Sequence, residues 1–189
     1  MLEFVKIEVF EKAGEVMAKR ISREECENLY KVHQTPAHVI GHCRAVAHVA
    51  LEIGRKLNEH GYDFDLELIE GAGLAHDVAR VEEEHWNVGA KILRELGYDD
   101  EANIVEVHMH RHVYDYDTLS EMDLVCIGDR LVIEDQYVGL DKRFTYIIDK
   151  AKVNYPHRIW KIEENREKLR DLLHKIEDCM GQTIDSLFL

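Results

Sequence analysis

The stretch Leu74-Ala75-His76-Asp77-Val78-Ala79-Arg80 places two side chains that can bind metals side by side in an apolar run of mostly small residues. An ionised aspartate in such a run costs free energy unless something pairs with it. A solvent-facing helix edge that happens to carry histidine and aspartate explains the stretch equally well. The choice depends on whether other histidines and aspartates are placed to meet His76 and Asp77.

The composition predicts a single globular domain with a core of its own. The chain has 189 residues, of which 46% are hydrophobic, a length that suits one domain. We expect no transmembrane helix, because no run reaches about 18 apolar residues. The first residues, with Glu3, Glu8 and Glu11, lack a signal-peptide pattern. The sequence therefore predicts a cytoplasmic protein with no membrane partner, whose four scattered cysteines are reduced thiols.

The net charge of −14 argues against a broad surface for nucleic acid or anionic membranes, since such a surface needs a basic patch. A small anionic substrate is still compatible with this charge, because a bound metal dominates the field around it. The twelve histidines are the most unusual part of the composition, and most of them are expected at the surface.

The pattern predicts an all-α fold, because helical periodicity dominates and no useful β alternation is present. We expect helices over residues 2–19, 22–33, 36–59, 66–79 and 83–96, two more that begin near residues 99 and 120, and a last one from 156 to about 180. The apolar stripe of this last helix includes Trp160, and Gly181 is expected to end the helix. Ser22 and Glu25 are expected to form a capping box at the start of the second helix. Thr35 is expected as an N-cap before Pro36. The small residues Gly71, Ala72, Gly73 and Ala75 would let another helix approach closely just before His76.

Further metal-capable side chains lie in or beside apolar helical runs. His42 falls on the apolar face of the 36–59 helix, where a hydrogen-bonded structural histidine is the usual explanation. Asp129 lies inside an apolar run, and its neighbour Arg130 is predicted to point about 100° away, so that the two do not pair. His110 is rotated about 200° from His108, which puts it at a site rim or in solvent. The full candidate set is His42, His76, Asp77, His85, His108 and Asp129.

This set is typical of metal sites that all-α proteins build by pointing ligands inward from several helices. Mixed imidazole and carboxylate ligands suit Mn, Fe, Co, Ni or Zn better than Ca. The order His … His-Asp … Asp resembles the HD-domain superfamily of metal-dependent phosphohydrolases, a single helical bundle. The resemblance rests on the segments 42–47, 74–80, 85–93, 104–109 and 127–132, and it extends from Thr35 to the C-terminus. Residues 1–34 are then a helical extension and 35–189 the HD-type domain.

The resemblance implies one or two divalent metals, with Mg as a further option beside the transition metals. It makes His42, His76, Asp77 and Asp129 ligands of a first metal. Asp77 would bridge to a second metal that His85 and His108 bind. Many two-metal members carry another histidine directly after the one that matches His108. This chain has Met109 at that position, with His110 as the alternative.

The same resemblance predicts a phosphohydrolase that cleaves a small phosphate ester, a nucleotide or dinucleotide, with metal-activated water. Asp77 and Arg80 are the expected catalytic residues, and Arg80, Arg111 and Arg130 the expected phosphate-binding residues. Surface salt bridges are favoured for Lys142 and Arg143. The alternatives are a non-catalytic metal- or nucleotide-binding regulatory module and a di-iron oxygenase on the same fold. A homo-oligomer is compatible with the amphipathic N-terminal helix.

Overall fold

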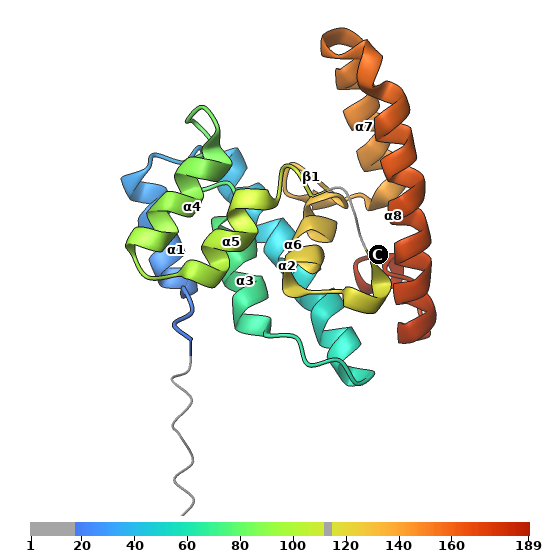
Figure 1. Ribbon diagram of the computed structural model, residues 1–189, viewed down its shortest axis with the longest axis horizontal. Helices are drawn as coiled ribbons and strands as arrows, with labels where there is room; N and C mark the ends of the chain where they lie inside the picture. Colours follow the sequence, from blue (N-terminus) through green and yellow to red (C-terminus); the bar gives the residue numbers. More distant parts are fainter. Residues whose placement is uncertain (1–17, 112–114) are drawn as a thin grey trace, which may run out of the picture.

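The computed structural model describes residues 18–111 and 115–189, and these are mostly helical (Figure 1). The helices are α1 (Arg23–Val32), α2 (Ala37–Glu59), α3 (Leu66–Ala75), α4 (His85–Glu95), α5 (Asp99–Val107), α6 (Glu121–Asp129), α7 (Gly139–Asn154) and α8 (Ile159–Met180). A two-stranded antiparallel hairpin, β1 (Val132–Ile133) and β2 (Gln136–Tyr137), joins α6 to α7. The all-α prediction is confirmed. The helix expected over residues 2–19 falls outside the described residues, except for 18 and 19, which are not helical.

Two apolar clusters form the core, and α2 and α3 contribute to both. One cluster joins them to α6, α7 and α8, and the other joins them to α1, α4 and α5. Figure 1 shows α1, α4 and α5 on one side of the molecule, α7 and α8 on the other, and α2, α3 and α6 between them. The His76-Asp77 pair therefore follows a helix that runs through the middle of the fold. No helix among the described residues is both long and apolar enough to cross a membrane.

The expected close approach of a second helix at residues 71–75 is confirmed. A Cβ atom built on Gly73 would lie 2.7 Å from the Cα atom and 2.9 Å from the Cβ atom of Ala47. A Cβ atom on Gly128 would lie 2.8 Å from the carbonyl oxygen of Val46. Glycine is thus required where α3 and α6 cross α2, because any side chain would overlap backbone atoms.

The α1 start is as predicted, with Ser22 and Glu25 forming a capping box. The prediction for Thr35 is wrong, because Pro36 is the N-cap of α2 and the buried Thr35 hydroxyl donates to the carbonyl of Val78 at 2.6 Å. No side chain caps α2, and the N–H of Val39 donates instead to the carbonyl of Pro36 at 2.9 Å. Thr35 instead ties the chain before α2 to the segment after α3.

The predicted end of α3 is also wrong, since the helix ends at Ala75 and residues 76–82 form turns. In a continuing helix the carbonyl of Leu74 would accept from the N–H of Val78. Here it accepts the buried hydroxyl of Tyr30, and the N–H of Val78 donates to Ala75 instead. Contacts from α1 and the link to α2 therefore set the backbone course of the His76-Asp77 segment.

The C-terminal helix ends at Gly181, which adopts the left-handed conformation (φ 66°), as predicted. Leu169, Leu172 and Ile176 of α8 are buried in the core. Trp160, which was expected in the same stripe, is 66% exposed, because it lies in the first turn of α8, beyond the core.

Candidate metal centre

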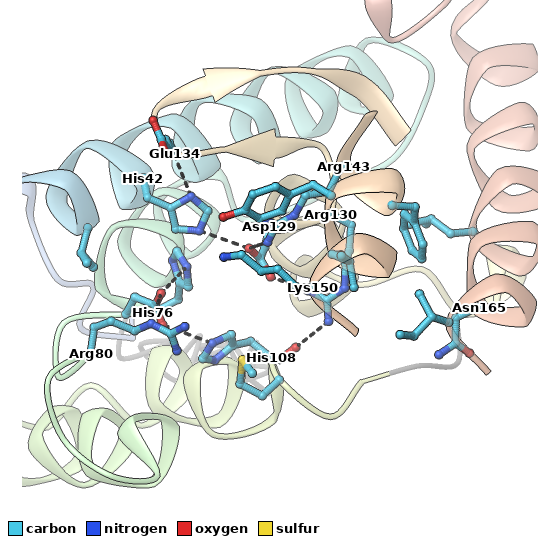
Figure 2. Close-up of a pocket in the computed structure, with 18 of the residues that line it drawn as sticks. His42, His76, Arg80, His108, Asp129, Arg130, Glu134, Arg143, Lys150 and Asn165 are labelled. Carbon is cyan, nitrogen blue, oxygen red and sulfur yellow. Dashed lines mark hydrogen bonds and ion pairs between the residues drawn. The ribbon is translucent and has the colours of Figure 1, made fainter. Parts of the chain in front are cut away.

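All six candidate residues come together at one place in the fold, and Figure 2 shows His42, His76, His108 and Asp129 around the cavity there. They come from separate segments of the chain, so that no single helix carries more than one of them. His42 lies on α2, His76 and Asp77 directly follow α3, His85 begins α4, His108 directly follows α5, and Asp129 ends α6. Their positions in or beside apolar helical runs singled these residues out in the sequence, and the packing of five helices brings them into contact.

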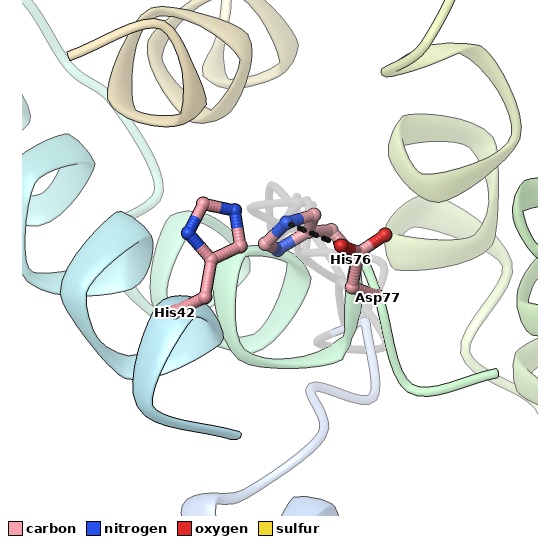
Figure 3. Close-up of side chains that lie close together, drawn as sticks. All are labelled: His42, His76 and Asp77. Carbon is pink, nitrogen blue, oxygen red and sulfur yellow. Dashed lines mark ion pairs between the residues drawn. The ribbon is translucent and has the colours of Figure 1, made fainter. Parts of the chain in front are cut away.

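Asp77 lies at the centre of the cluster and belongs to two sets of potential metal ligands. In the first set, one ligand atom each of His42, His76 and Asp77 lies within 4.8 Å of the others (Figure 3). Atoms of Asp77, His85 and His108 form a second set under the same limit. The Oδ1 atom of Asp77 lies 3.0 Å from Nε2 of His85 and 3.5 Å from Nε2 of His108. One carboxylate thus belongs to both sets of potential ligands.

Backbone carbonyls orient three of the imidazoles. The Nδ1 atoms of His42, His76 and His108 lie 2.9, 2.8 and 2.7 Å from the carbonyl oxygens of Glu134, Gly73 and Val105. A carbonyl only accepts hydrogen bonds, so Nδ1 carries the proton in each ring, and Nε2 of the neutral ring is a free electron-pair donor. This arrangement is the one that metal-binding histidines commonly adopt.

The local structure explains two of these orientations. His76 and His108 are both the C-cap residues of their helices, α3 and α5. The last carbonyls of a helix have no partner in the helix itself. Each of these histidines donates to the carbonyl three residues before it, which holds its ring beside the helix end. For His42, the turn of the β1–β2 hairpin supplies the carbonyl, at Glu134 with φ 54°.

Two buried polar atoms of the cluster, Nε2 of His76 and Oδ1 of Asp77, form no hydrogen bond of good geometry among the described residues, although Oδ1 of Asp77 lies 3.0 Å from Nε2 of His85. Buried polar atoms are normally paired, and a site that holds an ion is one explanation of such exceptions. The donor set of imidazoles and carboxylates also suits a divalent transition metal. The residues present therefore fit the metal that the resemblance implies.

The electrostatics keep the imidazole of His76 neutral and Asp77 ionised. Burial lowers the pKa of His76 to about 4. Burial alone would raise the pKa of Asp77, but the neighbouring histidines and Arg80 outweigh it and hold that pKa far below its ordinary value. Both groups are thus in the protonation state that binds a metal at neutral pH.

Asp129 is surrounded by three nitrogen groups. Its Oδ1 atom lies 3.2 Å from Nε2 of His42 and 3.2 Å from a guanidinium nitrogen of Arg143. Arg130 donates to Oδ2 and also to the carbonyl of His108 at 3.3 Å. Burial would raise the pKa of Asp129, but Arg130, His42 and Arg143 keep it well below the ordinary value.

The contacts of Asp129 overturn two expectations. Arg130 pairs with Asp129, although a helical rotation of 100° predicts that they separate. The reason is that α6 ends at Asp129, so Arg130 lies outside the helix and its long side chain turns back. Arg143, expected at the surface, is mostly buried, because the hairpin after α6 returns the chain and brings α7 over the cluster.

The other two predicted phosphate-binding arginines differ in position. Arg80 lines the cavity beside the cluster, 44% exposed, with one guanidinium nitrogen 2.8 Å from Nε2 of His85 and another 3.6 Å from Oδ2 of Asp77. Arg111 does not line this cavity. Its guanidinium donates instead to Asp123, a fully buried carboxylate on α6.

We expect Arg111→Ala to reduce stability and leave substrate binding unchanged. Asp123 keeps hydrogen bonds from the N–H and hydroxyl of Ser120, so the loss should be about 1 kcal/mol, below the ~3–5 kcal/mol typical of a fully broken buried pair. Urea unfolding measures the loss, with Arg55→Ala, which removes an exposed ion pair with Glu52, as the near-neutral control. A raised KM in the Arg111 variant would contradict this prediction and indicate that Arg111 binds the substrate.

The cluster opens into a cavity of about 530 Å³, within the ~300–1,000 Å³ that small-ligand sites occupy. Its far side is formed by residues that the sequence pattern did not single out, namely Tyr146 and Lys150 of α7 and Asn165 of α8. Met109 also lines the cavity, whereas His110 is exposed with its ring against Trp86. His112 lies outside the described residues.

Comparison with known proteins identifies the family to which this chain belongs. The family model named HD domain matches residues 39–136, just over half of the chain, and the chain belongs to this family. HD-domain proteins are in general metal-dependent hydrolases. All six cluster residues lie within the matched region.

An uncharacterized protein of Methanocaldococcus jannaschii, MJ0778, is 43% identical over 76 residues, which are 38% of this chain and 45% of that protein. The chain thus matches less than half the length of this relative. No solved structure matches the chain.

Proposed function

We propose that this protein is a phosphohydrolase that cleaves a phosphate ester of a small molecule, a nucleotide or dinucleotide, with one or two divalent transition metals bound at the cluster. The observation that carries the proposal is the position of Asp77 in two ligand sets at once. His42, His76, Asp77 and Asp129 would hold a first metal, and Asp77, His85 and His108 a second. When bound, such metals activate water for attack on phosphorus and stabilise the charge that develops there.

The residues around the cluster are suited to an anionic substrate. Four cationic side chains line the cavity (Arg80, Arg130, Arg143 and Lys150) against three acidic ones (Asp77, Asp129 and Glu134). The cavity lining thus has a surplus of one positive charge, whereas the whole chain has a net charge of −14. Guanidinium groups bind phosphate oxygens in pairs and hold the phosphorus in a fixed orientation. In this proposal Arg130 and Arg143 orient the phosphate, and Arg80 contacts it from the more exposed side.

The test combines metal analysis with a substrate panel. Protein purified without chelator should contain Mn, Fe, Co, Ni or Zn by mass spectrometry. It should release phosphate from a nucleotide or dinucleotide when one of these ions is supplied. Absence of release from every nucleotide, dinucleotide and simple phosphate ester with every ion would contradict the proposal. Oxygen consumption by an iron-loaded, reduced sample in the same panel would favour the oxygenase instead.

A further inference from the structure

We propose that α7 and α8 form a nucleoside-binding wall, and that Asn165 determines which base is accepted. This inference rests on the proposed function, since it concerns the leaving group of the same reaction. It assigns a role to the part of the chain that follows the matched family region, which ends at residue 136. The wall is defined as Tyr146, Ile147, Lys150, Ile162, Asn165 and Leu169, all of which line the cavity.

The wall is continuous because each helix presents one face to the cavity. On α7, positions 143, 146, 147 and 150 line the cavity, and on α8, positions 162, 165 and 169 do so. Spacings of three, four and seven residues place side chains on the same face of a helix. The two helices pack against each other, and Figure 2 shows Asn165 on the α8 side of the cavity, away from His76.

The chemistry of the wall differs from that of the cluster. Ile147, Ile162 and Leu169 are aliphatic, and Tyr146 adds an aromatic ring. Asn165 carries the one carboxamide among the described residues that line the cavity. A carboxamide both donates and accepts hydrogen bonds, as the edge of a nucleobase does, while apolar side chains and aromatic rings pack on its faces. A sugar phosphate would leave this apolar surface uncovered.

Lys150 connects the wall to the cluster. Its side chain extends from α7 toward the cluster (Figure 2), with Nζ 4.2 Å from the centre of the Tyr146 ring. It forms no ion pair with any residue in the described part of the chain. Arg143, on the same face of α7, contacts Asp129 at the cluster. A phosphate held at the cluster would therefore meet cations from α7, while the attached nucleoside lies along the wall.

The test uses Asn165→Ala and the isosteric Asn165→Asp, with Glu163→Ala as control, because Glu163 is exposed on the same helix. Rates are measured with Mn²⁺ on a panel of nucleoside 5′-monophosphates and on phenyl phosphate, which has no base. We expect Asn165→Ala to lower kcat/KM for the preferred nucleotide about tenfold, mainly through KM, because a net hydrogen bond is worth about that factor. Phenyl phosphate should be cleaved as before. Asn165→Asp loses the donor and should change the order of base preference.

Binding of the same nucleotides to the metal-free protein, measured by titration calorimetry, provides a readout that does not depend on activity. Weaker binding in both Asn165 variants but not in the control supports the wall. If both variants keep the wild-type kcat/KM, base preference and affinity, the nucleoside-binding wall is refuted and the proposed function is unaffected. If the wild type binds nucleotides through Asn165 but hydrolyses no ester, the proposed function fails and the binding wall stands. If the wild type binds no nucleotide, the wall is refuted.

Discussion

Asp77→Asn is expected to lower kcat/KM for phosphate release by more than about 100-fold while the protein remains folded. Asp77 contributes an oxygen to both ligand sets, and its ionised state is favoured by the surrounding histidines and Arg80. The amide has the same shape but no negative charge, so it is a poor ligand for a divalent ion. Loss of a group that merely orients a metal-binding histidine costs about 10- to 100-fold. Loss of the shared carboxylate itself should cost more.

The measurement pairs steady-state kinetics with metal content and circular dichroism. The variant should contain less metal than wild type and show the same helical spectrum. Asp63→Asn makes the same chemical change at an exposed position between α2 and α3, and it should leave metal content and rate unchanged. An Asp77 variant that binds metal and turns over like wild type would refute both the shared-ligand role and the proposed hydrolysis.

Gly73→Ala is expected to reduce the free energy of unfolding by about 2 kcal/mol. The new methyl group would lie 2.7 Å from the Cα atom of Ala47, which can move only if the α2 backbone moves. Overpacking of this kind costs up to about 3 kcal/mol. The better helix propensity of alanine returns about 1 kcal/mol. The carbonyl of Gly73 also orients His76, so a displaced α3 should weaken metal binding as well.

Urea unfolding of four proteins tests this packing: wild type, Gly73→Ala, Ala47→Gly and the double variant. Removing the Ala47 methyl group relieves its 2.9 Å contact but not the contact with Cα. The double variant should therefore be more stable than the sum of the two single losses predicts, which is the sign of direct coupling. Strict additivity would contradict direct coupling between the two positions. A Gly73→Ala variant as stable as wild type would mean that the helices separate at no cost.

Much of this fold was predictable because its determinants are local. The capping box at Ser22 and the glycine at 181 act within a few residues of chain, and both elements form as expected. Thr35 and the end of α3 were mispredicted for the opposite reason. The hydroxyls of Thr35 and Tyr30 bind carbonyls 43 and 44 residues away, and no local pattern shows such a partner.

The same distinction applies to the candidate site. Six metal-capable residues were identifiable because each is a polar side chain in or beside an apolar run, in an order that a known family shares. Arg143 could not be identified in this way, since its position depends on the hairpin that follows α6. Arg130 was misjudged because the rotation argument assumed that the helix continues through residue 130, whereas α6 ends at Asp129. Lys150 and Asn165 look like ordinary helix-surface residues until α7 and α8 are placed beside the cavity.

The division of the cavity between two parts of the chain has an evolutionary consequence. The six cluster residues lie within the region that the family shares, whereas α7 and α8 follow it. Under the proposed function, mutations on the cavity face of these two helices would change the substrate without touching the metal cluster. We therefore expect descendants of one ancestral hydrolase to diverge in substrate while retaining a common chemistry. Similarity over residues 39–136 should predict that chemistry, and similarity over α7 and α8 should predict the substrate.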